Sequence, residues 1–206
     1  RDSDIKLKNV GIPVSKFYKL IKEAGVKVNK NLLQLCTKGK SFPAILDFSV
    51  DFWEFLGLWM AEGSYVEKGG VRLSVSRKEE EYVSKLCRKL FGMVTIYRKP
   101  KTFGSDIYIS SAILSIIMKN VLGFTSGAKK KRIPDIVYNL DREHLAAFLR
   151  GYISGDGSLN IKTPAPMVEI TTSSPELADD INYLLLQFGI VAKTYSRKKT
   201  GQKRIC

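Results

Sequence analysis

Two nine-residue segments of the sequence end in a carboxylate followed by glycine. They are FLGLWMAEG, which carries Glu62, and LRGYISGDG, which carries Asp156. Each closes a run of apolar residues at helical spacing, so we predict that each acid lies in the last turn of a helix. There a carboxylate faces the negative end of the helix dipole, which costs about 0.3–1 kcal/mol unless a cation compensates. The two segments therefore predict a nearby cation, either a divalent metal or a lysine.

Small residues precede both acids at a spacing of four. Gly57 with Ala61, and Gly151 with Gly155, share one face of each predicted helix. Such residues allow two helices to pack backbone to backbone. If the helices pair about a pseudo-twofold axis, this contact brings the two acids together in an oxygen-rich site that suits Mg²⁺, or Mn²⁺ or Ca²⁺ in the same place. The candidate metal ligands are Glu62, Asp156, Ala61 and Gly155.

The pattern that follows each acid is repeated along the chain at an offset of 94 residues. Residues 71–76 alternate as a half-buried strand does, and residues 79–91 have helical spacing. Residues 168–172 and a helix opened by Pro175 repeat this order. Further strands are expected at 94–99, 106–110 and 190–197. Because only 50 residues follow Asp156, we expect the second copy to lack its last strand or helix.

One face of each predicted sheet is polar and basic. If Val71, Leu73 and Val75 point to the helices, the residues between them form an open face that fits a DNA duplex. Polar side chains there would read base edges, and lysines and arginines would hold phosphates. The candidate DNA-binding residues are Arg72, Ser74, Ser76, Arg77, Lys78, Tyr97, Lys99, Lys129, Lys130, Thr171, Ser173, Lys193, Tyr195, Arg197 and Lys198.

The composition favours nucleic acid as the partner. The 206 residues carry a formal net charge of +14, and a phosphate backbone is the usual counterpart of such an excess. The densest basic runs, 129–132 and 197–204, lie beside Gly, Thr and Pro and not along one helix face, which argues against an anionic membrane surface. No stretch reaches the ~20 apolar residues of a membrane span, and the N-terminus lacks an apolar signal region. We expect an intracellular protein, in the cytoplasm of a prokaryote or in an organelle.

Few other side chains are available for chemistry. Cys36, Cys87 and Cys206 have no CxxC spacing, which excludes a zinc or redox pair of the usual kind. The single histidine, His144, excludes mechanisms that need two imidazoles, and we interpret it as a surface residue. Catalysis must therefore rest on carboxylates, lysines and metal.

The two nonapeptides resemble the motifs of the LAGLIDADG homing endonucleases, in the single-chain form with two motifs. Gly57 and Gly151 stand at the third position of the motif, and Glu62 and Asp156 stand at the acidic eighth position. The sequence departs from the consensus at the sixth position, where Met60 and Ser154 replace Asp, and in having Glu at the eighth position of the first motif.

A second resemblance lies upstream of each motif. Lys40-Ser41-Phe42-Pro43 and Lys131-Arg132-Ile133-Pro134 are similar to the Lys-x-Ile-Pro element that the family carries near its metals. The resemblance implies that Lys131 and Lys40 are catalytic together with the two acids. Such a lysine would polarise the attacking water or neutralise charge on the phosphate.

The resemblance implies an α+β fold of two pseudo-symmetric αββαββα half-domains with saddle-shaped antiparallel sheets. We expect a short helical N-terminal extension at 1–38, half-domains at 39–128 and 141–206, and a basic linker at 129–140. The implied activity is hydrolysis of one phosphodiester on each strand of a long, asymmetric double-stranded DNA target by a monomer, encoded in an intron or intein. The alternative is a non-cleaving nucleic-acid-binding protein on the same scaffold, either an RNA maturase or a transcription regulator.

Overall fold

The computed structural model describes residues 16, 19, 22–25, 34–37, 40–43, 46–92, 94–161, 166–197 and 202–205. Residues 1–46 and 47–206 form two compact units.

The first unit contains a β-hairpin that the sequence did not predict. Strands β1 (Gln34–Thr37) and β2 (Lys40–Pro43) pair in antiparallel fashion, with Gln34 opposite Pro43. Residues 16, 19 and 22–24 are helical, as expected. The prediction of an all-helical extension was therefore wrong for residues 34–37, and the compact unit ends after Leu46, not after residue 38. The apolar run that we interpreted as a helical piece is short enough to pair as a strand, and periodicity alone does not separate the two cases.

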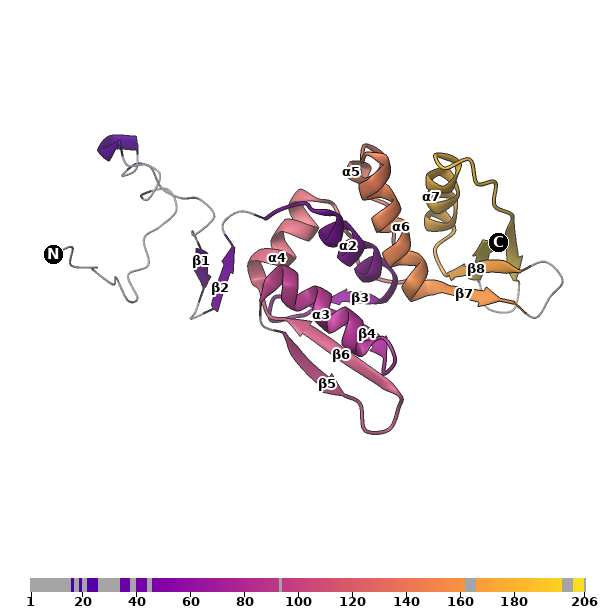
Figure 1. Cartoon of the computed structure of the whole chain (residues 1–206), viewed down its shortest axis with the longest axis horizontal. Coiled ribbons are helices and arrows are strands. Elements are labelled where there is room, and N and C mark those ends of the chain that lie inside the picture. Colours follow the sequence, from indigo (N-terminus) through magenta and orange to yellow (C-terminus); the bar gives the residue numbers. More distant parts are fainter. Residues whose placement is uncertain are drawn as a thin grey trace. The chain divides into compact units, whose positions relative to one another are not determined.

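Two helices, α2 (Val50–Glu62) and α6 (Arg142–Asp156), form the centre of the second unit and pack against each other (Figure 1). Nine consecutive residues of α2, from Phe52 to Met60, are buried. A helix that is buried on all sides belongs to the interior of a domain.

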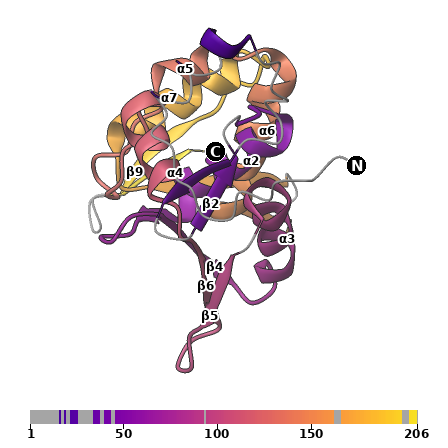
Figure 2. The same cartoon turned by 90° about the vertical axis from the view of Figure 1, so that its left-hand side faces the viewer.

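The first half of this unit contains a four-stranded antiparallel sheet. Its strand order is β3 (Gly63–Tyr65), β4 (Val71–Ser76), β6 (Gly104–Ile109) and β5 (Thr95–Arg98). The alternation along β4 is as predicted, since Val71, Leu73 and Val75 are buried. Helix α3 (Glu80–Phe91) packs on this sheet, and α4 (Ala112–Ile116) continues into the π-helix η2 (Ile117–Val121). The β5–β6 hairpin extends away from the helices (Figure 2).

The second half has a sheet of the same strand order. The strands are β7 (Gly157–Asn160), β8 (Met167–Thr172), β10 (Gln202–Ile205) and β9 (Thr194–Arg197). Helix α7 (Pro175–Leu186) packs on β8 and β10, and the short helix α5 (Asp135–Tyr138) precedes α6. All four strands are present, so the element expected to be missing is not a strand. Within the described part of the chain, no helix after β10 corresponds to α4.

The two halves are joined by an ion pair with a buried carboxylate as well as by apolar packing. Glu54 of α2 is 4% exposed, and its Oε2 accepts a hydrogen bond of 3.0 Å from Arg150 Nε of α6. The other oxygen of Glu54 accepts from the hydroxyl of Tyr82 in α3. No helix of the described residues is long and apolar enough to cross a membrane.

Candidate metal and nucleic-acid site

Each acid ends its helix where a strand begins at once. Glu62 is the last residue of α2 and Gly63 opens β3; Asp156 is the last residue of α6 and Gly157 opens β7. Both glycines have extended backbones, with φ of −93° and −87°. Glycine is therefore needed here because a side chain would not fit, and not because the backbone turns left-handed. A Cβ on Gly63 would lie 2.3 Å from the Trp59 carbonyl oxygen.

Glycine also sets how closely the two helices approach. A Cβ on Gly57 would lie 2.0 Å from the Phe148 carbonyl oxygen, and one on Gly151 would lie 2.1 Å from the Glu54 carbonyl oxygen. Real side chains do not tolerate such distances, so the two helices touch through their backbones. One turn further on, a Cβ on Gly155 would meet the Cβ of Ala61 at 2.5 Å.

This close approach brings the two acids together. The Cβ position of Gly155, which precedes Asp156, is 3.1 Å from the Cγ of Glu62. Burial raises the pKa of Glu62 to about 6, and repulsion from Asp156 and then Glu79 adds to the rise. Burial also raises the pKa of Asp156, against the opposing influence of Lys131. Two partly buried carboxylates that each resist ionisation are a place where a cation is stabilised.

Lys131 supplies positive charge at this place. Its Nζ donates to the carbonyl oxygens of Met60 at 2.5 Å and Ala61 at 2.8 Å, which belong to the last turn of α2, where helix carbonyls have no partner within the helix. The residue is only 8% exposed. Burial lowers the pKa of its ammonium, while Asp156 and Glu62 act in the opposite direction. The structure thus brings together three of the four residues predicted to be catalytic.

The fourth residue, Lys40, begins β2 in the other compact unit, and its side chain lies outside the described residues. Its catalytic role stays a prediction. Of the two predicted backbone-neighbour ligands, Ala61 uses its carbonyl to accept from Lys131, although a carbonyl oxygen has a second lone pair.

The donor set fits a hard divalent cation in part. Among the residues that the structure describes, no group of three or more His, Cys, Asp or Glu side chains could hold a metal. Glu62 and Asp156 would therefore supply only some of the oxygen ligands. Mg²⁺ commonly keeps several waters and takes one or two carboxylates together with substrate phosphates, which is compatible with a site that offers two acids.

Tyr152 is a site residue that the sequence analysis missed. It lies one helical turn before Asp156, it is fully buried, and its hydroxyl has no hydrogen-bond partner of ordinary geometry among the described residues. The hydroxyl nevertheless opposes the rise in the pKa of Asp156. The sequence did offer a sign of this contact, because Tyr152 and Asp156 are four residues apart and so share one face of the helix. Leu58 occupies the corresponding position of the first motif, so the two acids have unlike surroundings.

The open face of the first sheet holds its polar side chains in fixed positions. Arg72 Nε donates to Ser64 Oγ at 3.1 Å. Ser74 Oγ donates to Asp106 at 2.6 Å, and Lys99 Nζ is 2.8 Å from the same carboxylate. These hydrogen bonds lower the pKa of Asp106 despite its burial, so the carboxylate stays ionised. Asp106 was not among the predicted residues.

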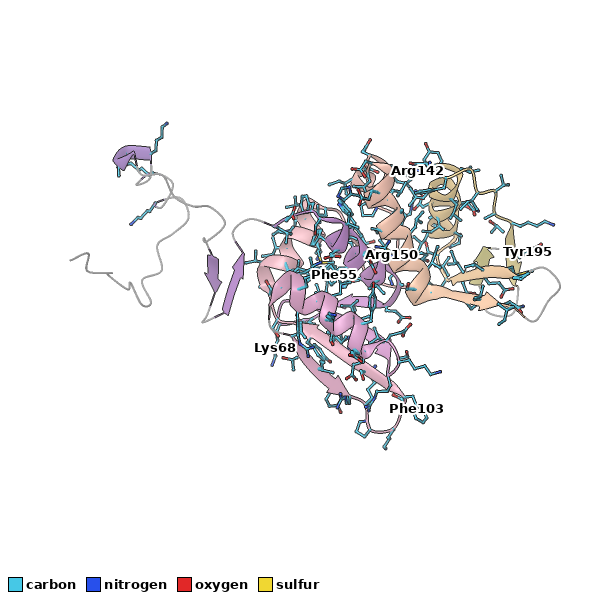
Figure 3. The ribbon with its side chains drawn as sticks, in the orientation of Figure 1. Phe55, Lys68, Phe103, Arg142, Arg150 and Tyr195 are labelled. Carbon is cyan, nitrogen blue, oxygen red and sulfur yellow. The ribbon has the colours of Figure 1, made fainter. Side chains whose placement is uncertain are left out.

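The remaining predicted residues of the first half lie around the β5–β6 hairpin. Ser76 Oγ donates to Glu79 at 2.6 Å, Lys78 is exposed, and Tyr97 is 54% exposed. A cavity of about 450 Å³ is lined by Arg77, Lys99 and the hairpin residues 100–103. Phe103, at the tip of the hairpin in Figure 3, is 92% exposed and was not predicted.

The second sheet is described less completely. Thr171 and Ser173 are half-buried, and Lys193 Nζ lies 5.7 Å from the ring centroid of Tyr195, which is exposed (Figure 3). The Arg197 side chain and Lys198 lie outside the described residues.

Two further predictions concern the linker and the single histidine. Lys129 and Lys130 are exposed in the loop that leads to Lys131. His144 belongs to the first turn of α6, where its Nδ1 is 2.7 Å from the capping Asp141, at the opposite end of the helix from Asp156.

Comparison with known proteins defines the class of fold. Residues 143–206 match the family described as LAGLIDADG-like domain. The solved structure of I-DmoI in complex with DNA and Mn has a TM-score of 0.57 at 15% identity and covers 77% of this chain and 89% of its own. Full-length DUF199/WhiA from Thermatoga maritima has a TM-score of 0.53 at 15% identity and covers 85% and 54%. The chain has the mixed helix and antiparallel sheet fold of the LAGLIDADG homing endonucleases, which confirms the predicted fold class.

Two curated relatives match over most of this chain. A DNA polymerase of Thermococcus hydrothermalis is 33% identical over 149 residues, which are 69% of this chain and 9% of the polymerase. The DNA-directed RNA polymerase subunit Rpo1C of Methanocaldococcus jannaschii is 31% identical over 157 residues, which are 74% of this chain and 17% of that subunit. The chain therefore corresponds to a small part of the length of these relatives.

The raised pKa of Glu62 predicts a pH-dependent stability. Because the folded protein holds this proton up to a pKa of about 6, above the ordinary value of 4.5, the free energy of unfolding falls as pH rises through that window. Without metal, we expect Glu62→Gln to melt at a higher temperature than the wild type at about pH 8 and at the same temperature at about pH 4. Calorimetry in EDTA measures this. An equal difference at both pH values would show that Glu62 titrates normally.

Proposed function

We propose that this chain is a metal-dependent endonuclease that hydrolyses one phosphodiester on each strand of a long, asymmetric DNA target. The observation that carries the proposal is the convergence of Glu62, Asp156 and Lys131 where α2 and α6 end. The first strand of each sheet starts at the residue after each acid, so a duplex bound along the polar sheet faces would pass next to the acids.

The residues have distinct roles in the proposed reaction. Glu62 and Asp156 would hold Mg²⁺, or Mn²⁺ or Ca²⁺ in the same site. A bound divalent cation lowers the pKa of a water and stabilises charge on the reacting phosphate. Lys131, which is held at the end of α2, would stabilise the charge that develops on a phosphate oxygen in the transition state. One chain supplies both acids, which supports action as a monomer.

The comparisons support a module carried inside a host gene. Stretches of about the same length match within a DNA polymerase and within an RNA polymerase subunit, two proteins with different activities. A segment that recurs as 9% and 17% of such different proteins behaves as an insertion and not as part of either activity. We therefore propose an intron or intein origin, and a prokaryotic cytoplasm as the compartment in which the protein meets DNA.

A plasmid that carries the uninterrupted allele of the host gene tests the proposal. Incubation with Mg²⁺ should linearise this plasmid, and sequencing of the ends should show one break on each strand. Removal of the metal by EDTA should stop cleavage but leave the complex in a gel shift, because binding rests mainly on phosphate contacts. The same plasmid without the insertion site is the matched control.

A nucleic-acid-binding protein that does not cleave is the second candidate. The observation in its favour is that Lys131 already places an ammonium beside the two acids and binds the carbonyl of Ala61. A permanent internal cation of this kind would replace a metal. A stable complex with the plasmid in Mg²⁺, without any strand break, would reject the endonuclease and support this candidate.

A further inference from the structure

The segment that carries Lys131 is tied to helix α7 by three consecutive residues. Ser174 Oγ, at the N-cap of α7, donates to the carbonyl oxygen of Lys131 at 2.8 Å. Asp180 of α7 accepts from the backbone N–H of Ile133 at 3.0 Å. The guanidinium of Arg132 adds two more bonds to Asp180, from Nε at 2.9 Å and from Nη2 at 3.0 Å.

These contacts fix the direction in which Lys131 extends. The Arg132 side chain is held by α7, whereas the Lys131 side chain reaches the end of α2, where its Nζ is bound by two carbonyl oxygens. Lys131 therefore spans from α7 in the second half to the terminal turn of the first motif helix. Its backbone is anchored at one end of this span and its ammonium at the other.

Burial makes the anchor strong and specific. Ser174 is fully buried and Asp180 is 7% exposed. Hydrogen bonds from Arg132, Ile133 and Tyr138 outweigh burial and hold the pKa of Asp180 below its ordinary value. Removal of the carboxylate would leave the buried N–H of Ile133 without its acceptor, which costs more than the bond itself contributed.

We propose that Asp180, assisted by Ser174, is a positioning residue that acts through Lys131 and has no contact of its own with the DNA. This inference rests on the proposed function. The hydrogen bonds from Ser174 and Asp180 to residues 131–133 hold Lys131 beside Glu62 and Asp156. Loss of these bonds would move the ammonium of Lys131 away from the reacting phosphate, while the polar faces of the two sheets stay unchanged. A displacement of about 1 Å in such a group lowers the rate by up to about a hundredfold.

Single-turnover cleavage of the target plasmid tests the inference with the full chain. Asp180→Ala should lower the cleavage rate constant by about tenfold to a hundredfold, while the Kd from gel shifts stays within about twofold. Asp180→Asn keeps an acceptor for Ile133 and should lose less. In a Lys131→Met background, Asp180→Ala should cause no further loss, because residues that act as one unit are not additive. Losses that multiply in the double variant would overturn the proposal.

Glu54→Gln is the matched control. Glu54, like Asp180, is a buried carboxylate that is hydrogen-bonded to a half-exposed arginine, but its partners are Arg150 and Tyr82 and not the segment that carries Lys131. Its substitution should lower the melting temperature and leave the single-turnover rate unchanged. Equal rate losses in Glu54→Gln and Asp180→Asn would show that Asp180 acts only through general stability.

Competitive labelling with acetic anhydride tests the anchor without any cleavage. In the wild type, Lys131 should react far more slowly than the exposed Lys129 and Lys130, as measured by mass spectrometry of peptides. Asp180→Ala should raise the labelling of Lys131 severalfold, and Glu54→Gln should not. If the wild type cleaves no DNA, the proposed function fails while this labelling result still decides the anchor. Unchanged labelling of Lys131 in Asp180→Ala would refute it.

Discussion

Replacement of either acid by its amide, Glu62→Gln or Asp156→Asn, is expected to lower the rate of DNA cleavage by about a thousandfold. A neutral amide cannot provide the charge that holds a divalent cation, and the several kcal/mol that such a cation contributes to the transition state correspond to about three powers of ten in rate. DNA affinity should change little, because the candidate phosphate contacts lie on other residues. Single-turnover cleavage and gel shifts on the same preparations measure the two effects.

The control for this experiment is Glu81→Gln, which makes the same chemical change at an exposed position of α3. It should leave both cleavage and binding unchanged. Cleavage at the wild-type rate by both Glu62→Gln and Asp156→Asn would show that these two acids are not the metal ligands of the reaction. Loss of cleavage together with loss of binding would mean instead that the acids maintain the helix pair.

The second large effect is expected on stability. Gly57→Ala or Gly151→Ala would place a methyl group about 2 Å from a carbonyl oxygen of the facing helix, at 2.0 Å from Phe148 and 2.1 Å from Glu54. Backbone oxygens on a packed helix cannot move aside as a flexible side chain does. The helices must separate, and we expect a loss of about 3 kcal/mol or more in the free energy of unfolding. Urea denaturation followed by circular dichroism measures the loss.

Gly104→Ala serves as the comparison, because a Cβ there would meet its nearest neighbour, Thr102, at an ordinary 3.5 Å. It should change the free energy of unfolding by less than about 1 kcal/mol. The Gly57 and Gly151 variants should also lose metal-dependent cleavage, since separated helices no longer hold the two acids together. Wild-type stability in either variant would show that α2 and α6 do not touch through these glycines.

Local patterns predicted the elements that carry the site. Alternation along residues 71–76 identified β4 and its buried face, and the repeat after each acid predicted two sheets of the same kind. The glycines at positions 57 and 151 predicted a close helix pair. These features can be predicted from the sequence because helix and strand periodicity are set by residues near one another in the chain.

Local sequence patterns were not sufficient where contacts between distant residues decide the structure. Residues 34–37 were expected to be helical and pair as a strand with 40–43, since a short apolar run fits either structure. The sequence also left open whether the second copy lacks a strand or a helix; β10 completes its sheet, and within the described residues it is a helix that has no counterpart there. The sequence indicated that a helix ends at Gly63 and at Gly157, but not why glycine is needed there. In the structure, a side chain at either position would collide with the preceding helical turn.

By itself, the sequence determined which residue types end the two central helices and that a basic protein with paired acids would favour nucleic acid and metal. Only the tertiary structure decided which cation lies beside those acids and what holds it. Lys131 contacts carbonyls 70 and 71 positions away and is anchored by Ser174 and Asp180, 43 and 49 positions further along the chain. Such pairings have no local period, because they depend on where the packed helices place their ends.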